Sequence, residues 1–255
     1  MFKMKTKILL SGCNGKMGRA ITALVKERED CEIAAGVDLV STGNEGYPVF
    51  SSAADVTVPV DVVVDFSHPS LLEPLLAFGR KTKTPLVLCT TGYSKEQTQA
   101  VHEASKEIPV FSSGNMSLGI NLLMELAKRA VQVLGDGFDV EIVEMHHNQK
   151  IDAPSGTALM LADAVSEAKQ EEMHYMYDRH SQRKKREKNE IGIHSVRGGT
   201  IVGEHEVIFA GHHEVIKLSH SAQSKEVFAA GAVNAAVFLS RQKPGFYNMS
   251  DLLKE

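Results

Sequence analysis

Apolar and amphipathic segments alternate through the first 115 residues. Residues 60–67 (VDVVVDFS) are a run of β-branched residues, which is typical of a strand buried on both faces. Residues 18–29 place Ile21, Leu24 and Val25 at helical spacing. Strands that alternate with helices predict a parallel, doubly wound sheet. The other strands expected here are residues 7–12, 31–38, 85–92 and 108–114, and the other helices are 71–83 and 94–107.

The pattern changes after residue 116. One long helix is expected from Leu122 through Leu134, and three consecutive strand candidates later in the chain favour a mixed or antiparallel sheet. Around them we expect a strand at 138–147, the three candidates at 191–199, 203–211 and 213–222, helices at 155–169 and 228–242, and a last turn at 247–253. The predicted fold class is therefore α/β: a Rossmann-type doubly wound sheet in residues 1–116, to which 231–255 return, and an α+β domain with a mixed sheet in 117–230.

Residues 169–190 are dense in charge and poor in branched apolar residues. This composition favours a solvated, mobile loop or a frayed helix. The basic stretch RKKREK within it would need a wider basic surface to bind nucleic acid, and the net charge of the 255-residue chain is −4. No nucleic-acid partner is therefore expected.

The overall composition is that of a globular protein with ample material for a core, 43% hydrophobic and 24% charged. No apolar run approaches the roughly 18 residues that span a bilayer, so no membrane partner is expected. The three cysteines, Cys13, Cys31 and Cys89, are odd in number and lack CxxC spacing. They indicate reduced thiols in a cytoplasmic protein and give no sign of a metal site.

A glycine-rich loop, SGCNGKMGR, joins the first strand to the first helix. Gly12, Gly15 and Gly18 form G-x-x-G-x-x-G, a variant of the dinucleotide fingerprint. Residues without Cβ let the backbone approach a pyrophosphate, and the helix start offers N–H groups to the anion. Asp38 ends the second strand and is placed to accept hydrogen bonds from a ribose. The alternative is a tight turn with no ligand.

The residues around Asp38 bear on the choice of nucleotide. A carboxylate there favours the ribose diol of NAD, and Leu39 stands where an arginine could receive the phosphate of NADP. Lys16 could partly neutralise that phosphate, so NADP stays open. Two later strand ends, Cys89–Tyr93 and Ser112–Ser117, are small and polar and could border a nicotinamide ring; ordinary loop chemistry is the alternative.

The segment EMHHNQKIDAPSGTA (residues 144–158) concentrates titratable groups at the end of a strand. His146, His147 and Lys150 precede a helix start whose N–H groups suit a carboxylate. Asp152 and Ser155 are both capable N-cap residues. The pattern indicates an anionic substrate that must be protonated, with a surface cluster or metal binding as alternatives. Adjacent histidines on a strand point to opposite faces, which disfavours a shared metal.

Six strings together resemble the dihydrodipicolinate reductase family, the 4-hydroxy-tetrahydrodipicolinate reductases of bacterial lysine biosynthesis. They are GCNGKMGR, DFSHP, CTTGY, SSGNMSLGIN, EMHHNQKIDAPSGTA and SVRGGTIVGEHEVIFAG, and their order covers essentially the whole chain. The resemblance implies reduction of a cyclic imine dicarboxylate by NADH or NADPH, with loss of water from the hydroxylated substrate. It also implies a homotetramer formed through the sheet of the second domain, which would serve substrate binding and oligomerisation.

The resemblance assigns roles to residues of this chain. His146 would be a proton donor or acceptor and Lys150 the proton donor after hydride addition. His147, Gly156 and Thr157 would contact the substrate. The residues assigned to the nucleotide are Gly12, Cys13, Asn14, Gly15, Lys16, Met17, Asp38, Cys89, Thr90, Thr91, Ser113, Gly114, Asn115 and Met116. Cys89, where the family commonly has glycine, and Leu39, in place of an arginine, depart from its pattern.

Two other functions compete with the reductase. A non-catalytic dinucleotide-binding sensor of the same fold would have little use for His146, His147 and Lys150. A related amino-acid or aspartate-type dehydrogenase would lack the DAPSGTA string, which is present.

Overall fold

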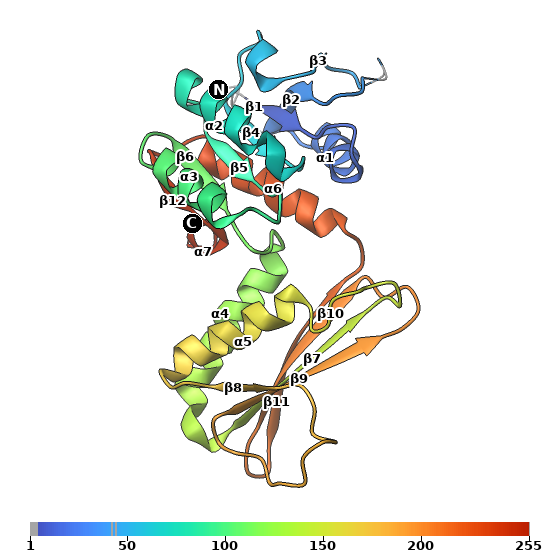
Figure 1. The fold of residues 1–255 in the computed structure, drawn as a ribbon, viewed down its shortest axis with the longest axis vertical. Helices are drawn as coiled ribbons and strands as arrows, with labels where there is room; N and C mark the ends of the chain where they lie inside the picture. The colour runs from blue at the N-terminus through green and yellow to red at the C-terminus, as the bar shows by residue number, and fades with distance from the viewer. Residues whose placement is uncertain (1–4, 42, 44, 255) are drawn as a thin grey trace. The chain divides into compact units, whose positions relative to one another are not determined.

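The computed structural model describes residues 5–41, 43 and 45–254, which form two compact units (Figure 1). Unit 1 comprises Met1–Met116 and Glu226–Glu255, and unit 2 comprises Ser117–Lys225. The chain therefore leaves unit 1 once, completes unit 2, and returns at residue 226.

Unit 1 is built on a seven-stranded parallel sheet in the order β12-β6-β5-β4-β1-β2-β3. Its strands are β1 (Thr6–Ser11), β2 (Cys31–Val37), β3 (Val49–Phe50), β4 (Val62–Asp65), β5 (Leu86–Leu88), β6 (Pro109–Ser112) and β12 (Gly245–Tyr247). All four residues of β4 are buried, as its β-branched run predicts. The predicted fold class is confirmed, although β3 and β12 were not anticipated.

Helices complete unit 1, and the last long one belongs to its core. They are α1 (Lys16–Lys26), α2 (Leu72–Thr82), α3 (Lys95–Ser105), α6 (Glu226–Leu239) and α7 (Met249–Leu252), with single 3-10 turns at Ala53–Asp55 and Pro69–Leu71. Helix α6 packs on α1 and on β1, β4, β5 and β6. Half of its buried residues are alanines, which allow close approach, and a Cβ at Gly231 would overlap the carbonyl oxygen of Met116. The Arg28 guanidinium donates to Asn234 Oδ1 over 2.6 Å.

Unit 2 has a mixed five-stranded sheet in the order β11-β10-β7-β9-β8. Its strands are β7 (Asp139–His146), β8 (His174–Met176), β9 (Glu190–Arg197), β10 (Gly203–Ala210) and β11 (Val215–Ala222). β10 pairs antiparallel with β7 and β11, while β7–β9 and β8–β9 are parallel.

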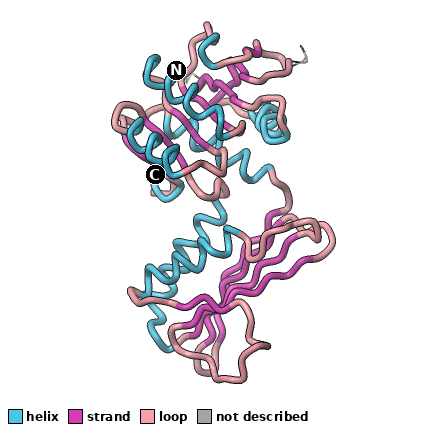
Figure 2. The backbone as a smooth tube through the Cα atoms, viewed as in Figure 1, coloured by secondary structure: helices cyan, strands magenta, loops and turns pink. Residues whose placement is uncertain are grey.

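Two helices, α4 (Leu118–Leu134) and α5 (Gly156–Lys169), lie side by side on one face of this sheet (Figures 1 and 2). A 3-10 turn at Gly135–Gly137 follows α4. The core between helices and sheet includes Leu161, Ile142 and Val207. Side chains of β10 and β11 that point away from the two helices are partly or fully exposed.

The long helix of unit 2 begins earlier than expected. Its first residue is Leu118 and not Leu122, and the Ser117 hydroxyl accepts a hydrogen bond from Ile120 N over 3.3 Å. The stretch Gly-Ile-Asn (residues 119–121) is helical because this N-cap satisfies a main-chain donor.

Much of the segment 169–190 is an exposed loop, one of the two forms that its charge favoured, but the segment is also attached to the sheet. It contains β8, and Arg186 donates to Glu141 Oε1 over 3.0 Å and to Asp139 Oδ1 over 2.8 Å. Glu190, which is 1% exposed, pairs with Arg179 and Lys184. Its charges bind the segment to the sheet. Among the described residues, no helix has the length and apolar character needed to cross a membrane.

Candidate active site

The glycine loop of unit 1 has the geometry of an anion-binding turn. Gly12 has φ +76°, and a Cβ there would lie 2.7 Å from Phe66 O. A Cβ at Gly18 would overlap Gly12 O, so both positions require glycine. Gly15 is the N-cap of α1 and provides no side-chain hydrogen bond to the helix start. The first N–H groups of α1, from Lys16 onward, are therefore suited to a phosphate.

Asp38 directly follows β2 and faces this loop. Its Oδ2 accepts from Asn14 N over 2.9 Å and its Oδ1 from Val40 N over 3.3 Å. Asp38, Asn14 and Val40 line a cavity of about 490 Å³ together with Gly15 and Arg19. The Arg19 Nε donates to Asn14 O over 3.0 Å. A carboxylate, a guanidinium and exposed glycine main chain fit a nucleotide's ribose and phosphates.

Arg19 was not among the residues that the sequence singled out. It follows the third glycine of the loop, and its place in the cavity with Asp38 depends on the turn that the glycines permit.

A buried aspartate anchors the third predicted nucleotide segment. Asp65, 1% exposed at the end of β4, accepts from Thr90 Oγ1 over 2.7 Å and from Ser67 Oγ over 2.5 Å. Cys89 N donates to Asp65 O over 3.0 Å. Burial, and then the Asp65 charge, raise the pKa of the Cys89 thiol well above its usual value. Cys89 and Thr90 are thus held against β4, and Asp65 is a residue that sequence reasoning missed.

The fourth segment, Ser113 to Met116, follows β6. The Ser113 hydroxyl donates to Asn115 O over 3.1 Å, and Asn115 and Met116 are buried. All predicted nucleotide residues therefore follow the carboxyl ends of β1, β2, β5 and β6, the edge at which open α/β sheets bind ligands. The structure groups them in unit 1.

Two of the three predicted substrate residues, Gly156 and Thr157, lie in unit 2 at the start of α5, and His147 follows β7. Ser155 is the N-cap, and its hydroxyl accepts from Ala158 N over 3.1 Å. Gly156 and Thr157 are the first two residues after it, and a Cβ at Gly156 would meet no atom within 4 Å. The helix start therefore faces open space beside donors that a carboxylate can use. Pro154 precedes the helix, after a cis peptide bond.

Lys150 lies in the loop between β7 and α5. Its Nζ forms an ion pair with Asp152 Oδ1 at 2.7 Å, and its N donates to His147 O over 3.2 Å. The hydrogen bond from Lys150 lowers the pKa of Asp152. Asp152 is thus a partner of the lysine and not the N-cap.

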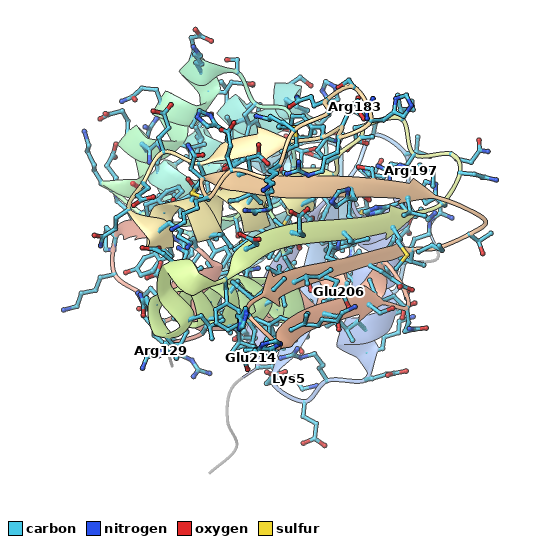
Figure 3. All side chains as sticks on the ribbon, turned by 90° about the horizontal axis from the view of Figure 1, so that it is seen from below. Lys5, Arg129, Arg183, Arg197, Glu206 and Glu214 are labelled. Atoms are coloured by element: carbon cyan, nitrogen blue, oxygen red, sulfur yellow. The ribbon has the colours of Figure 1, made fainter. Side chains whose placement is uncertain are left out.

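His146 ends β7 and contacts a carboxylate that sequence reasoning assigned no role. Its Nδ1 lies 2.6 Å from Glu144 Oε2. Arg197, at the end of β9 and labelled in Figure 3, donates to both Glu144 oxygens over 2.8 and 2.7 Å. Ser155 N donates to Glu144 Oε1 over 3.1 Å. Burial raises the pKa of Glu144, but these bonds and one from Ser195 outweigh burial and lower it to about 2.

A second histidine lies beside this group. His205 is 5% exposed, its ring centre is 5.2 Å from that of His146, and its Nε2 lies 3.0 Å from Ser155 Oγ. Burial, and then the neighbouring His146, lower the pKa of His205 to about 4. His205 is therefore neutral at pH 7. No cluster of three or more metal-ligating side chains occurs in the described part of the chain.

Comparison with known families matches both halves of the chain. The profile "Dihydrodipicolinate reductase, N-terminus" matches residues 6–116, and "Dihydrodipicolinate reductase, C-terminus" matches residues 119–253. Together they cover nearly every described residue of the two units.

Curated relatives are similar over their full length. The 4-hydroxy-tetrahydrodipicolinate reductase of Caldanaerobacter subterraneus subsp. tengcongensis is 54% identical over 252 residues, 99% of this chain and 100% of the relative. The corresponding protein of Clostridium tetani is 52% identical over 250 residues, 98% of each chain.

One solved structure is similar in both fold and sequence. The dipicolinate-bound dihydrodipicolinate reductase from Paenisporosarcina sp. TG-14 superposes with a TM-score of 0.80 at 26% identity, covering 96% of this chain and 98% of that one.

Proposed function

The chain belongs to the dihydrodipicolinate reductase family and has 4-hydroxy-tetrahydrodipicolinate reductase activity in lysine biosynthesis, and on this basis we propose which residues bind the reductant, hold the substrate and move protons. The observation that carries these assignments is local. His146, Lys150 and the open start of α5 all lie within residues 146–157.

The reductant is NADH or NADPH, which supplies a hydride when bound. Residues 12–17 would hold the pyrophosphate at the start of α1, and residues 89–91 and 113–116 would border the nicotinamide. Asp38 suits the ribose diol of NADH, while Arg19 in the same cavity offers a cation to the 2′-phosphate of NADPH. We therefore expect both nucleotides to support turnover, and kcat/KM measured with each would rank them.

The substrate is a small dicarboxylate held in unit 2. The N–H groups of Gly156 and Thr157 would bind one carboxylate, with Lys150 as a cationic partner and His147 as a further contact. The related reductase that binds dipicolinate, itself a dicarboxylate, supports this assignment.

Proton transfer completes the reduction. Hydride addition to the conjugated imine leaves negative charge delocalised toward nitrogen, which a nearby cation stabilises and an acid neutralises. Lys150 would donate the proton to the enamine carbon. His146 would exchange a proton with the substrate beside it. Each reduction consumes one hydride and one proton, so after product release only Lys150 is reprotonated from solvent, and the exchange at His146 gives no net proton transfer.

Replacing Lys150 by alanine tests the assignment. We expect kcat to fall about 100-fold or more, because a positioned general acid contributes 10²–10⁴-fold. The loss of reduced-nicotinamide absorbance reports turnover, and calorimetric titration reports nucleotide binding, which should be unchanged. Lys128→Ala, which removes an exposed pair with Glu167, is the matched control.

Wild-type turnover by Lys150→Ala would remove this lysine from the chemistry. A wild-type chain that bound the nucleotide and never oxidised it with substrate present would instead favour the sensor.

We also propose a homotetramer formed through the sheet face of unit 2 that α4 and α5 leave uncovered. This face carries Val143, Met145, Ile208 and the 58%-exposed Val215 beside polar residues such as Glu206, labelled in Figure 3. Sedimentation of the wild type should give four chains per particle, and Val143→Glu should give smaller species. A wild-type monomer at micromolar concentration would contradict the proposal.

A further inference from the structure

We propose that Glu144 is a positioning residue for His146: it fixes which imidazole nitrogen exchanges a proton with the substrate. The proposal rests on the role of His146 in the proposed function, and extends it to a residue that never touches the substrate.

The Glu144 and His146 side chains lie together because of the two-residue period of a β-strand. Residues 144 and 146 are two apart on β7, so both point to the helix-covered face of the sheet. Glu144 is fully buried, and the His146 side chain is 12% exposed. The 2.6 Å separation between His146 Nδ1 and Glu144 Oε2 is that of a strong hydrogen bond.

The partners of Glu144 decide which of the two atoms carries the hydrogen. Arg197 donates two hydrogen bonds to this carboxylate and Ser155 N a third. A carboxyl group that receives three donors in a buried site stays ionised, and an ionised carboxylate only accepts. His146 Nδ1 must therefore donate, which leaves Nε2 as the nitrogen that gains or loses a proton.

The surroundings of Nε2 fit this role. A Cβ on Gly203, at the start of the neighbouring strand β10, would lie 3.1 Å from His146 Nε2. Glycine therefore keeps the space beside this nitrogen clear. A larger residue at 203 would crowd the reacting atom.

The same carboxylate also connects the acid to the substrate-binding helix start. Glu144 accepts from the N-cap residue Ser155, and Arg197 donates to Asp152 O over 2.8 Å. The imidazole, the loop that carries Lys150 and the first turn of α5 are thus held by one buried ion pair. Orientation of all three depends on Glu144 remaining a carboxylate.

The test is Glu144→Gln in the full-length enzyme. Glutamine keeps one acceptor oxygen but presents an NH₂ group, which can donate to Nδ1 and favour the other tautomer. We expect kcat to fall roughly 100-fold, as when a histidine loses the carboxylate that orients it. The KM for the nucleotide, which unit 1 binds, should not change.

Nitrogen NMR of the histidine ring supplies a readout that lost stability alone would not move. In the neutral wild-type enzyme, His146 should carry its hydrogen on Nδ1, and in Glu144→Gln this tautomer should lose its dominance. Glu190→Gln is the matched control, because Glu190 is equally buried and paired with Arg179 at the opposite end of β9. It should lower stability and leave the His146 tautomer and kcat unchanged.

A wild-type His146 with its hydrogen on Nε2 would overturn the proposal, even if Glu144→Gln failed to fold. So would wild-type kcat in a folded Glu144→Gln enzyme whose parallel His146→Ala variant is inactive. Wild-type kcat in His146→Ala would instead refute the proposed function of that histidine, which separates the two failures.

Discussion

The buried histidine of β10 makes the stability of unit 2 depend on pH. His205 has a pKa of about 4 in the folded protein, against about 6.5 for an exposed histidine. Between these values the unfolded chain binds one more proton than the folded chain, so protonation favours unfolding. The stabilisation is fully present above pH 6.5 and is lost as the pH falls toward 4.

The structure sets the size of the effect. The gap between the two pKa values corresponds to about 3 kcal/mol in total, of which about 2 kcal/mol falls between pH 7 and pH 5. The lowered pKa of Glu144 makes its own contribution fall mainly between pH 4.5 and pH 2, below this window.

His205→Gln removes the titrating group and keeps a polar atom for Ser155. Urea unfolding followed by circular dichroism at pH 7 and pH 5 should show that the wild type loses about 2 kcal/mol more than this variant. His174→Gln, at an exposed histidine of the same unit, should keep the wild-type pH dependence. Equal losses for wild type and His205→Gln would refute the reasoning.

Three further substitutions test the scaffold. Asp65→Asn, which weakens the anchor on Thr90, should reduce nucleotide affinity about tenfold in calorimetry, and unchanged affinity would exclude an anchoring role. Gly18→Ala should abolish nucleotide binding, because the new Cβ overlaps Gly12 O; measurable binding by this variant would show that the loop can relax. Arg186→Met should lower the free energy of unfolding by about 1–3 kcal/mol and expose its segment to protease, whereas wild-type resistance would mean that the ion pairs contribute little.

Periodicity predicted the fold class because the central strands of unit 1 are buried on both faces and its helices α1, α2 and α3 are amphipathic. Strands β3, β8 and β12 escaped prediction for a physical reason. Each has two or three residues, too few to show a period, and each exists because it pairs with a longer neighbour. For the charged segment 169–190, composition predicted an exposed loop but not its attachment to the sheet, because composition does not reveal that Arg186 meets carboxylates on β7.

The candidate site was predictable where one short segment carries it. His146, Lys150 and Gly156 are close in sequence, so their types and spacing already indicate a site, while their roles stay proposals. The partner of Glu144 could not be found in this way. Arg197 is 53 positions further along and reaches it only because β7 and β9 are parallel neighbours in register.

The return of the chain to unit 1 has a consequence for its biosynthesis. Helix α6 and strand β12 are synthesised after the whole of unit 2, yet α6 packs on β1, β4, β5 and β6, which are synthesised before it. Unit 2 is contiguous in the sequence. It is therefore fully synthesised while β1, β4, β5 and β6 of unit 1 still lack the helix that packs on them. A premature stop near residue 225 therefore damages the half of the protein that was translated first.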